Sequence, residues 1–224
     1  LKKHYNAVIE PNDMGLVQQE ETESFSINER FEFVSNLVNM VASGITPSAV
    51  ITGEGGLGKT HAVRQAITSA DLIEGEDFVF IKGYSTARGL YNCLYDNNGR
   101  LIVFDDCDSV LEDKVALNLL KGALDSSKKR TIAWNTDSRM LRSEGIPDKF
   151  EFKGAAIFIT NIKFEHVKSK KLRDHLDALE SRCHYIDLQM DTTREKILRI
   201  KQIVGDGMLD KYEFDNPDVA RDEI

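Results

Sequence analysis

Eight consecutive residues, from Gly53 to Thr60, have the types and spacing of a phosphate-binding loop. Their glycines let the backbone curl, so that successive N–H groups point at one anion. Lys59 is placed to reach the β- and γ-phosphates of a nucleotide, and the Thr60 hydroxyl is placed to ligate Mg²⁺. The alternative is a glycine turn that carries Lys-Thr by coincidence. The residues predicted to contact the nucleotide are Gly53, Glu54, Gly55, Gly56, Leu57, Gly58, Lys59, Thr60 and His61.

Two acidic residues, Asp105 and Asp106, follow the apolar run 101–104. The carboxyl end of a strand in a parallel sheet faces the ligand crevice, which is where these acids are expected. Asp105 is then placed to hold Mg²⁺, directly or through water, and Asp106 to polarise an attacking water. A strand followed by an acidic turn is the alternative. A further apolar run, 155–159, ends in Thr160 and Asn161, which we expect at the same sheet edge.

The elements that must position these residues are strands alternating with helices. Short apolar runs without a helical period predict buried strands, and apolar residues at helical spacing predict the helices. Strands are predicted at 49–51, 78–81, 101–104, 131–134, 149–152, 155–159 and 185–188, and helices at 31–41, 61–67, 85–96, 115–124 and 166–182. A last helix is predicted to begin after a Thr192 cap and to carry Ile197, Leu198, Ile200 and Ile203. This alternation predicts a three-layer α/β/α fold with a mainly parallel sheet.

The composition limits the function classes. The 224 residues are 41% hydrophobic, and 29 Lys and Arg against 37 Asp and Glu give a net charge of −8. This excess of negative charge argues against a protein that coats nucleic acid without sequence specificity, although a local basic patch is compatible with it. The three cysteines are far apart, so we expect reduced thiols, a cytoplasmic location and no structural zinc. No apolar run approaches 18 residues, so no membrane partner is expected.

Together these motifs resemble those of the AAA+ ATPases, over about residues 31–204. The resemblance implies Walker A at 53–60, Walker B at 101–106 and a γ-phosphate sensor at Asn161. It also implies ATP and Mg²⁺ as ligands, a five-stranded sheet in the order 5-1-4-3-2, and assembly into a ring, expected to be a hexamer. The corresponding domains are a lead-in at 1–24, the AAA+ nucleotide-binding α/β domain at 25–190, and a partial helical lid with an acidic tail at 191–224.

Arg182 lies in the string Ser181-Arg182-Cys183, which looks like the SRC motif of clamp loaders. The resemblance implies that this arginine reaches the γ-phosphate of the neighbouring subunit. One arginine supplied in this way is worth roughly 10³–10⁵ in rate. The alternative is an arginine at a helix end that bonds carbonyls or an acid such as Glu180. With Asp106 and Asn161, Arg182 completes the predicted catalytic set.

Two further segments have both a functional and an ordinary interpretation. The strands at 131–134 and 149–152 resemble the hairpin that one AAA+ group places before sensor 1, with Arg139, Arg142 and Lys149 available to face nucleic acid. They are equally compatible with a surface loop. Tyr84 is either a pore-loop aromatic or a residue of the strand end.

The resemblance is imperfect at Walker B, which ends Asp-Asp where the family usually has Asp-Glu. Three hypotheses therefore remain. The first is an ATP-hydrolysing ring that remodels or moves along DNA or protein. The second is an ATP-controlled switch that oligomerises and seldom hydrolyses, for which Asp106 is the main support. The third is a small-molecule kinase, which the Thr-Asn pair and the position of Arg182 disfavour.

Overall fold

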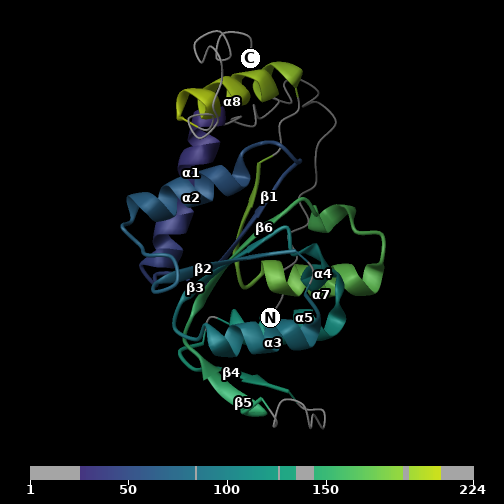
Figure 1. Ribbon diagram of the computed structural model, residues 1–224. Coiled ribbons are helices and arrows are strands. Elements are labelled where there is room, and N and C mark those ends of the chain that lie inside the picture. The colour runs from purple at the N-terminus through teal and green to yellow at the C-terminus, as the bar shows by residue number, and fades with distance from the viewer. Residues whose placement is uncertain (1–25, 84, 126, 135–143, 189–191, 208–224) are drawn as a thin grey trace, which may run out of the picture.

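The computed structural model describes residues 26–83, 85–125, 127–134, 144–188 and 192–207 (Figure 1). The strands are β1 (Ser48–Thr52), β2 (Phe78–Lys82), β3 (Leu101–Asp105), β4 (Arg130–Ala133), β5 (Lys149–Phe152), β6 (Ala155–Thr160) and β7 (His184–Asp187). The helices are α1 (Ile27–Ala42), α2 (Lys59–Ser69), α3 (Ala87–Asp96), α4 (Asp108–Glu112), α5 (Lys114–Ala123), α7 (Lys170–Glu180) and α8 (Thr193–Gly205), with a 3₁₀ turn at Phe164–His166. Most predicted elements are present, whereas α4 and the 3₁₀ turn were not predicted.

Five strands form one parallel sheet in the order β2-β3-β6-β1-β7. With the hairpin β4–β5 set aside, this is the order 5-1-4-3-2, so the predicted fold is confirmed. β1 lies between β6 and β7, with Thr52 opposite Thr160 on one side and Asp187 on the other. The loop that follows β1 therefore emerges between the carboxyl ends of two neighbouring strands, where α/β sheets bind ligands.

Each face of the sheet is covered by helices, and successive strand residues point to opposite faces (Figure 1). In β1, Ala49 and Ile51 pack in the core under α1 and α2, whereas Val50 packs in the core under α3, α5 and α7. The central strands β1, β3 and β6 are mainly apolar, as expected for strands whose two faces are both buried. No helix of the described ranges is long and apolar enough to cross a membrane.

Two helix starts follow the sequence signals closely. Ser26 and Glu29 form a capping box at α1, and Thr192 and Glu195 form another at α8. Each box satisfies backbone N–H groups that the first helical turn leaves without partners. The predicted cap at Thr192 is therefore confirmed.

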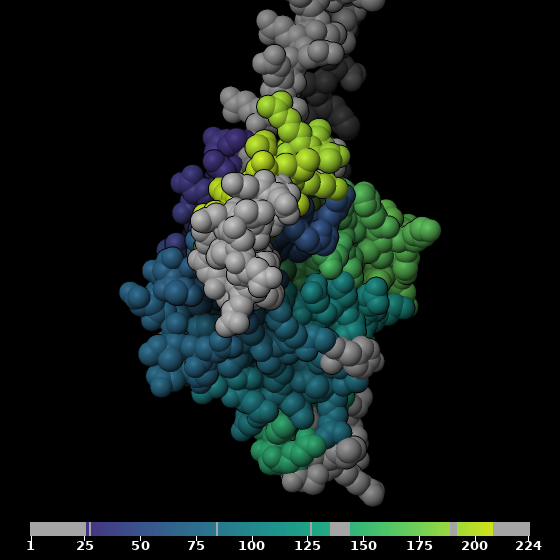
Figure 2. Space-filling model, turned by 45° about the horizontal axis from the view of Figure 1, so that its top comes forward, coloured from purple at the N-terminus to yellow at the C-terminus, as the bar shows by residue number. Residues whose placement is uncertain are grey.

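The apolar face predicted for the last helix is only partly correct. Ile203 is buried, but Ile197, Leu198 and Ile200 are 45%, 51% and 38% exposed. α8 also buries Val204 and Arg199, and Arg199 lies four positions before Ile203 and hence on the same helical face. α8 packs on the phosphate loop and α1 through this face, and Figure 2 shows α8 beside the start of α1.

The predicted hairpin is present and is anchored to α3. Its strands β4 and β5 are antiparallel, with Ile132 opposite Phe150. Tyr91 of α3 lies 5.2 Å from Phe150 between ring centroids and donates a hydrogen bond to the Pro147 carbonyl. Lys149 lies in β5. Arg139, Arg142 and Tyr84 lie outside the described residues.

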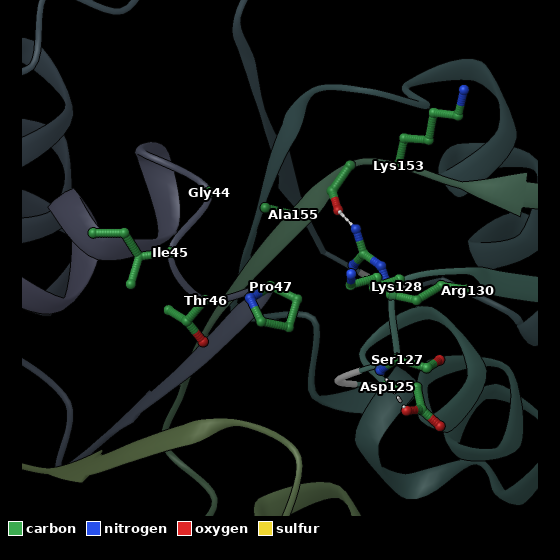
Figure 3. A pocket seen from close by; sticks show the side chains of 11 residues that line it. Gly44, Ile45, Thr46, Pro47, Asp125, Ser127, Lys128, Arg130, Lys153 and Ala155 are labelled. Atoms are coloured by element: carbon green, nitrogen blue, oxygen red, sulfur yellow. Dashed lines mark hydrogen bonds between the residues drawn. The ribbon is translucent and has the colours of Figure 1, made fainter.

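A pocket of about 300 Å³ lies at the foot of the hairpin, at the amino end of β1 and β6 (Figure 3). Arg130 lines it and donates to the carbonyls of Ala123 and Gly154, at 2.9 and 2.7 Å. It thereby joins the end of α5 to the connection between β5 and β6. Arg130 is thus a cation at the C-terminal end of α5, where a positive charge interacts favourably with the helix dipole.

Candidate functional site

The phosphate loop connects β1 directly to α2. Gly56 and Gly58 have φ values of 81° and 77°, a left-handed region that favours glycine. Gly58 is the N-cap of α2 and provides no side-chain cap, so the first N–H groups of the helix stay available to an anion. The loop lines a cavity of about 250 Å³. The cavity is bordered by Gly55, Gly56, Leu57, Gly58, Lys59, Thr60, His61, Asp106, Ile159 and Asn161.

Two predicted nucleotide contacts, Gly53 and Glu54, are not among the residues that line this cavity. A Cβ added at Gly53 would lie 3.1 Å from the Leu188 carbonyl oxygen, so this glycine allows the turn to pass close to the chain after β7. The Glu54 side chain instead forms an ion pair with Lys196 of α8. Glu54 therefore connects the loop to the last helix.

Lys59 is buried at the centre of the site. Its ammonium donates to the carbonyls of Gly53 and Glu54 and to Asn161 Oδ1, each at 2.8 Å. Burial lowers the pKa of Lys59, and the nearby carboxylates, Asp106 and Asp105 foremost, oppose that shift. An ammonium has three donors, so the side chain is fully hydrogen-bonded within the protein. A γ-phosphate would have to replace at least one of these acceptors.

Thr60 and Asp105 lie side by side, as a shared metal site requires. Thr60 Oγ1 donates to Asp105 Oδ1 at 2.8 Å, and Asp105 is fully buried at the end of β3. Mg²⁺ prefers oxygen ligands and is commonly held by one or two protein oxygens together with phosphates and water. The described residues contain no group of three or more His, Cys, Asp or Glu side chains suited to a metal. The hydroxyl and carboxylate present fit Mg²⁺.

Asp106 and Asn161 meet at the mouth of the cavity. Asn161 Nδ2 donates to Asp106 Oδ1 at 3.2 Å, while Asn161 Oδ1 accepts from Lys59. Lysine only donates and a carboxylate only accepts, so these two neighbours fix the orientation of the amide. The exposed Asp106 has a φ of 54°, which is uncommon for a residue other than glycine. Its amide donates to the Ile159 carbonyl at 3.0 Å and stabilises this turn.

Arg182 forms only local hydrogen bonds within the described residues. Its guanidinium donates to the Ala178 carbonyl and to Ser181 Oγ, both at the end of α7. In a single subunit Arg182 thus caps its own helix, as the alternative interpretation describes. A role at the site of another subunit remains a prediction.

Three residues of the site were not singled out from the sequence. Asp108 accepts from Thr160 Oγ1 at 2.6 Å and so stabilises the strand end that carries Asn161. Lys82 forms an ion pair with Asp105 across neighbouring strands. Lys82 directly follows the predicted strand 78–81, and a charged residue at that position was a signal that polar groups lie at this edge of the sheet.

The third is Arg199 of α8, whose Nε donates to the Leu57 carbonyl at 3.3 Å. Its guanidinium lies 3.3 Å from the centroid of the Phe31 ring, a cation–π contact. Burial lowers the pKa of Arg199 to about 10. Arg199 thus connects α1, α8 and the phosphate loop, although nothing in its sequence position distinguishes it from a solvent-facing arginine.

No protein-family model matches the chain. Over 182 residues the chain is 36% identical to an uncharacterized 36.7 kDa protein of Enterobacteria phage T4, encoded in the nrdC–mobD intergenic region. The alignment covers 80% of this chain and 56% of that relative. The chain therefore spans a little over half the length of this relative.

Two solved structures illustrate the structural similarity. NtrX from Brucella abortus, crystallised in complex with ATP, aligns with a TM-score of 0.52 and 14% identity, over 85% of this chain and 44% of NtrX. A mutant of RuvB from Thermotoga maritima aligns with a TM-score of 0.46 and 14% identity, over 82% of this chain and 54% of RuvB. Sequence identities this low give information on the fold alone. The TM-score of the RuvB alignment is too low to support the assignment of the fold. With its strand order and its phosphate loop, the chain has a three-layer α/β/α P-loop fold similar to that of NtrX.

Proposed function

We propose that this chain is an ATP-binding and ATP-hydrolysing AAA+ module that assembles with neighbouring subunits into a ring and remodels or translocates a macromolecule. The main support is the cluster at the carboxyl end of the sheet, where Lys59 bonds Asn161, Asn161 bonds Asp106, and Thr60 bonds Asp105. Three separate chain segments contribute to this cluster. Each side chain has the type that phosphoryl transfer to water requires.

The roles follow from the geometry. The N–H groups of 55–60 and the Lys59 ammonium bind the phosphates, and Thr60 and Asp105 hold Mg²⁺. Mg²⁺ bound there would neutralise negative charge that develops during phosphoryl transfer. Asp106, exposed at the cavity mouth, orients and polarises the water. Asn161 positions the side chains of Asp106 and Lys59 through its hydrogen bonds to both, and it is placed to bond the γ-phosphate.

We assign residues 25–190 to the nucleotide-binding domain, residues 191–224 to a partial lid and acidic tail, and residues 1–24 to a lead-in. In the proposed assembly Arg182 leaves its helix end and donates to the γ-phosphate of the next subunit. Such head-to-tail contacts form a ring when they close, and we propose a hexamer in the cytoplasm. The three free cysteines are consistent with a reducing compartment.

The macromolecule is DNA or protein. The hairpin β4–β5 favours DNA, because it lies at the opposite end of the sheet from the nucleotide site and Lys149 belongs to it. The net charge of −8 favours protein. Stimulation of turnover by single- or double-stranded DNA, compared with an unfolded protein, decides between them.

A second candidate function is an ATP-controlled switch that binds and oligomerises without efficient hydrolysis. The observation that favours it is Asp106, which is one methylene shorter than glutamate and is held by the Asn161 amide. Tight Mg²⁺-ATP binding without turnover is the outcome that this function requires.

Calorimetric titration with ATP and MgCl₂ tests the site itself. We expect wild-type binding, about 10–100-fold weaker binding in Lys59→Ala because a charged hydrogen bond to phosphate is lost, and unchanged binding in Lys170→Ala. Lys170 is an exposed lysine at the start of α7, which makes it a matched control. Equal affinities in all three proteins would contradict the proposed site.

Arg182 is tested by mixing subunits. Arg182→Ala and Lys59→Ala are each expected to be inactive alone, and a mixture should regain part of the wild-type rate if the arginine acts in trans. A mixture as inactive as its parts, with a rate per subunit independent of protein concentration, would argue against assembly.

A further inference from the structure

Lys82 contacts the carboxylate that the proposed function assigns to Mg²⁺. It is the last residue of β2 and lies opposite Asp105 in the register of β2 and β3. Its ammonium is 2.7 Å from Asp105 Oδ2, whereas the other carboxylate oxygen, Oδ1, accepts from Thr60. The two oxygens of Asp105 thus face one hydroxyl and one cation.

The two partners differ greatly in burial. The Asp105 side chain is 1% exposed and the Lys82 side chain is 59% exposed. A buried carboxylate is costly unless a cation or hydrogen bonds compensate its charge. Lys59 is also near, but its donors are committed to Gly53, Glu54 and Asn161. Within the described residues, Lys82 is the cation in direct contact with Asp105.

This ion pair is close but poorly directed. Asp105 Oδ2 has no hydrogen-bond partner of acceptable geometry in the described residues, although Lys82 Nζ lies within ion-pair distance. The contact therefore depends mainly on charge. The ammonium of a lysine that is more than half exposed is already partly hydrated, so it can move away from the acid into solvent at little cost in free energy. The flexible side chain does not hold the ammonium at the acid.

We propose that Lys82 is an internal counter-ion of Asp105, which compensates the carboxylate in the metal-free protein and is displaced when Mg²⁺ binds. A metal held beside Thr60 would contact Asp105 Oδ1, so the metal and the Lys82 ammonium would lie on the two oxygens of one carboxylate, where two cations repel each other at short range. Lys82 thus competes with the metal and sets the Mg²⁺ concentration that the site requires. The inference rests on the proposed function, because it takes Thr60 and Asp105 as metal ligands.

Lys82→Met is the direct test, since methionine keeps an unbranched apolar stem and removes the charge. Mn²⁺ prefers oxygen ligands as Mg²⁺ does, and its free concentration is measurable by electron paramagnetic resonance. With Mn²⁺ titrated in the presence of saturating ATP, we expect the dissociation constant to fall about 10-fold in Lys82→Met, as loss of one close charge repulsion implies. Without metal or nucleotide, we expect Lys82→Met to melt at a lower temperature than the wild type and to be stabilised more by MgCl₂.

Two control variants separate charge from shape. Lys82→Arg keeps the cation and should keep the wild-type Mn²⁺ affinity. Lys129→Met removes an exposed lysine that pairs with Glu151 of the hairpin, and it should leave the Mn²⁺ affinity unchanged. Should Lys82→Met not fold even with MgCl₂, Lys82→Gln replaces it with the same expected results.

The outcomes also separate this inference from the function on which it rests. Unchanged or weaker Mn²⁺ binding in Lys82→Met, with normal binding in the wild type, overturns the role of Lys82 and leaves the nucleotide site intact. Absence of ATP-dependent Mn²⁺ binding in the wild type overturns the proposed function itself.

Discussion

Lys59 Nζ donates to Asn161 Oδ1 at 2.8 Å, which connects the phosphate loop to the end of a strand 102 residues away in sequence. The same amide donates to Asp106 Oδ1 at 3.2 Å. The phosphate-binding lysine and the proposed water-polarising acid are therefore joined through one asparagine. If nucleotide binding replaces the bond from Lys59 to Asn161, the amide that donates to Asp106 loses one of the two partners that fix its orientation.

Asn161→Ala should lower the rate of ATP hydrolysis about 10–100-fold, because it removes hydrogen bonds to one cation and one carboxylate. Nucleotide affinity should fall much less, because the loop and Lys59 remain. Phosphate release and binding of a fluorescent ATP analogue measure the two effects. Asn39→Ala, at an exposed position of α1, is the matched control and should behave as the wild type. A rate unchanged in Asn161→Ala would remove this residue from the mechanism.

Asp106→Asn should abolish most turnover while keeping the fold and the binding of Mg²⁺-ATP. Asparagine tolerates the observed φ of 54° as aspartate does, so the backbone is not strained further. It cannot accept a proton, and loss of general-base assistance costs roughly 10²–10⁴ in rate. Single-turnover hydrolysis measures the rate and circular dichroism monitors the fold. Full turnover in this variant would show that water is activated elsewhere.

Gly58→Ala should destabilise the protein through two separate effects. The φ of 77° costs an alanine roughly 1–2 kcal/mol, and the added Cβ would lie 3.3 Å from Ile203 Cγ2 of α8. Gly75→Ala isolates the first effect, because that glycine has a φ of 90° and a Cβ added there would have nothing within 4 Å. Urea unfolding should show a larger loss at Gly58. Equal losses would mean that α8 does not pack against the loop in solution.

Buried thiols should make the protein less stable in alkali. Burial raises the pKa of Cys107 from 9.0 to about 11, and its Sγ lies 3.3 Å from the Ile81 carbonyl oxygen. A pKa that is higher in the folded state stabilises the fold fully below pH 9 and progressively less as the pH rises toward 11. Urea unfolding between pH 8 and 11 should show this decline, with a shallower slope in Cys107→Ala. Identical slopes would contradict the assigned burial of this thiol.

The sequence predicts which of these side chains the fold brings together where its signals are local. The loop 53–60, the acids that end β3 and the polar pair that ends β6 each lie within one short segment, and parallel strands bring these ends to one edge. Lys82 was missed because its contact with Asp105 depends on the register of two strands. Arg199 was missed because its burial depends on how α8 docks, and the helix turns Ile197, Leu198 and Ile200 outward instead.

The central claim is that the cluster around Lys59 hydrolyses ATP, and multiple-turnover phosphate release with MgCl₂ tests it most directly. We predict sustained release by the wild type, at a rate per subunit that rises with protein concentration, and a loss of at least about 100-fold in Lys59→Ala. Lys170→Ala should match the wild type. The opposite result is a wild type that binds Mg²⁺-ATP tightly but releases no phosphate, alone or with DNA or unfolded protein. It would contradict hydrolysis and would support the second candidate function, the ATP-controlled switch.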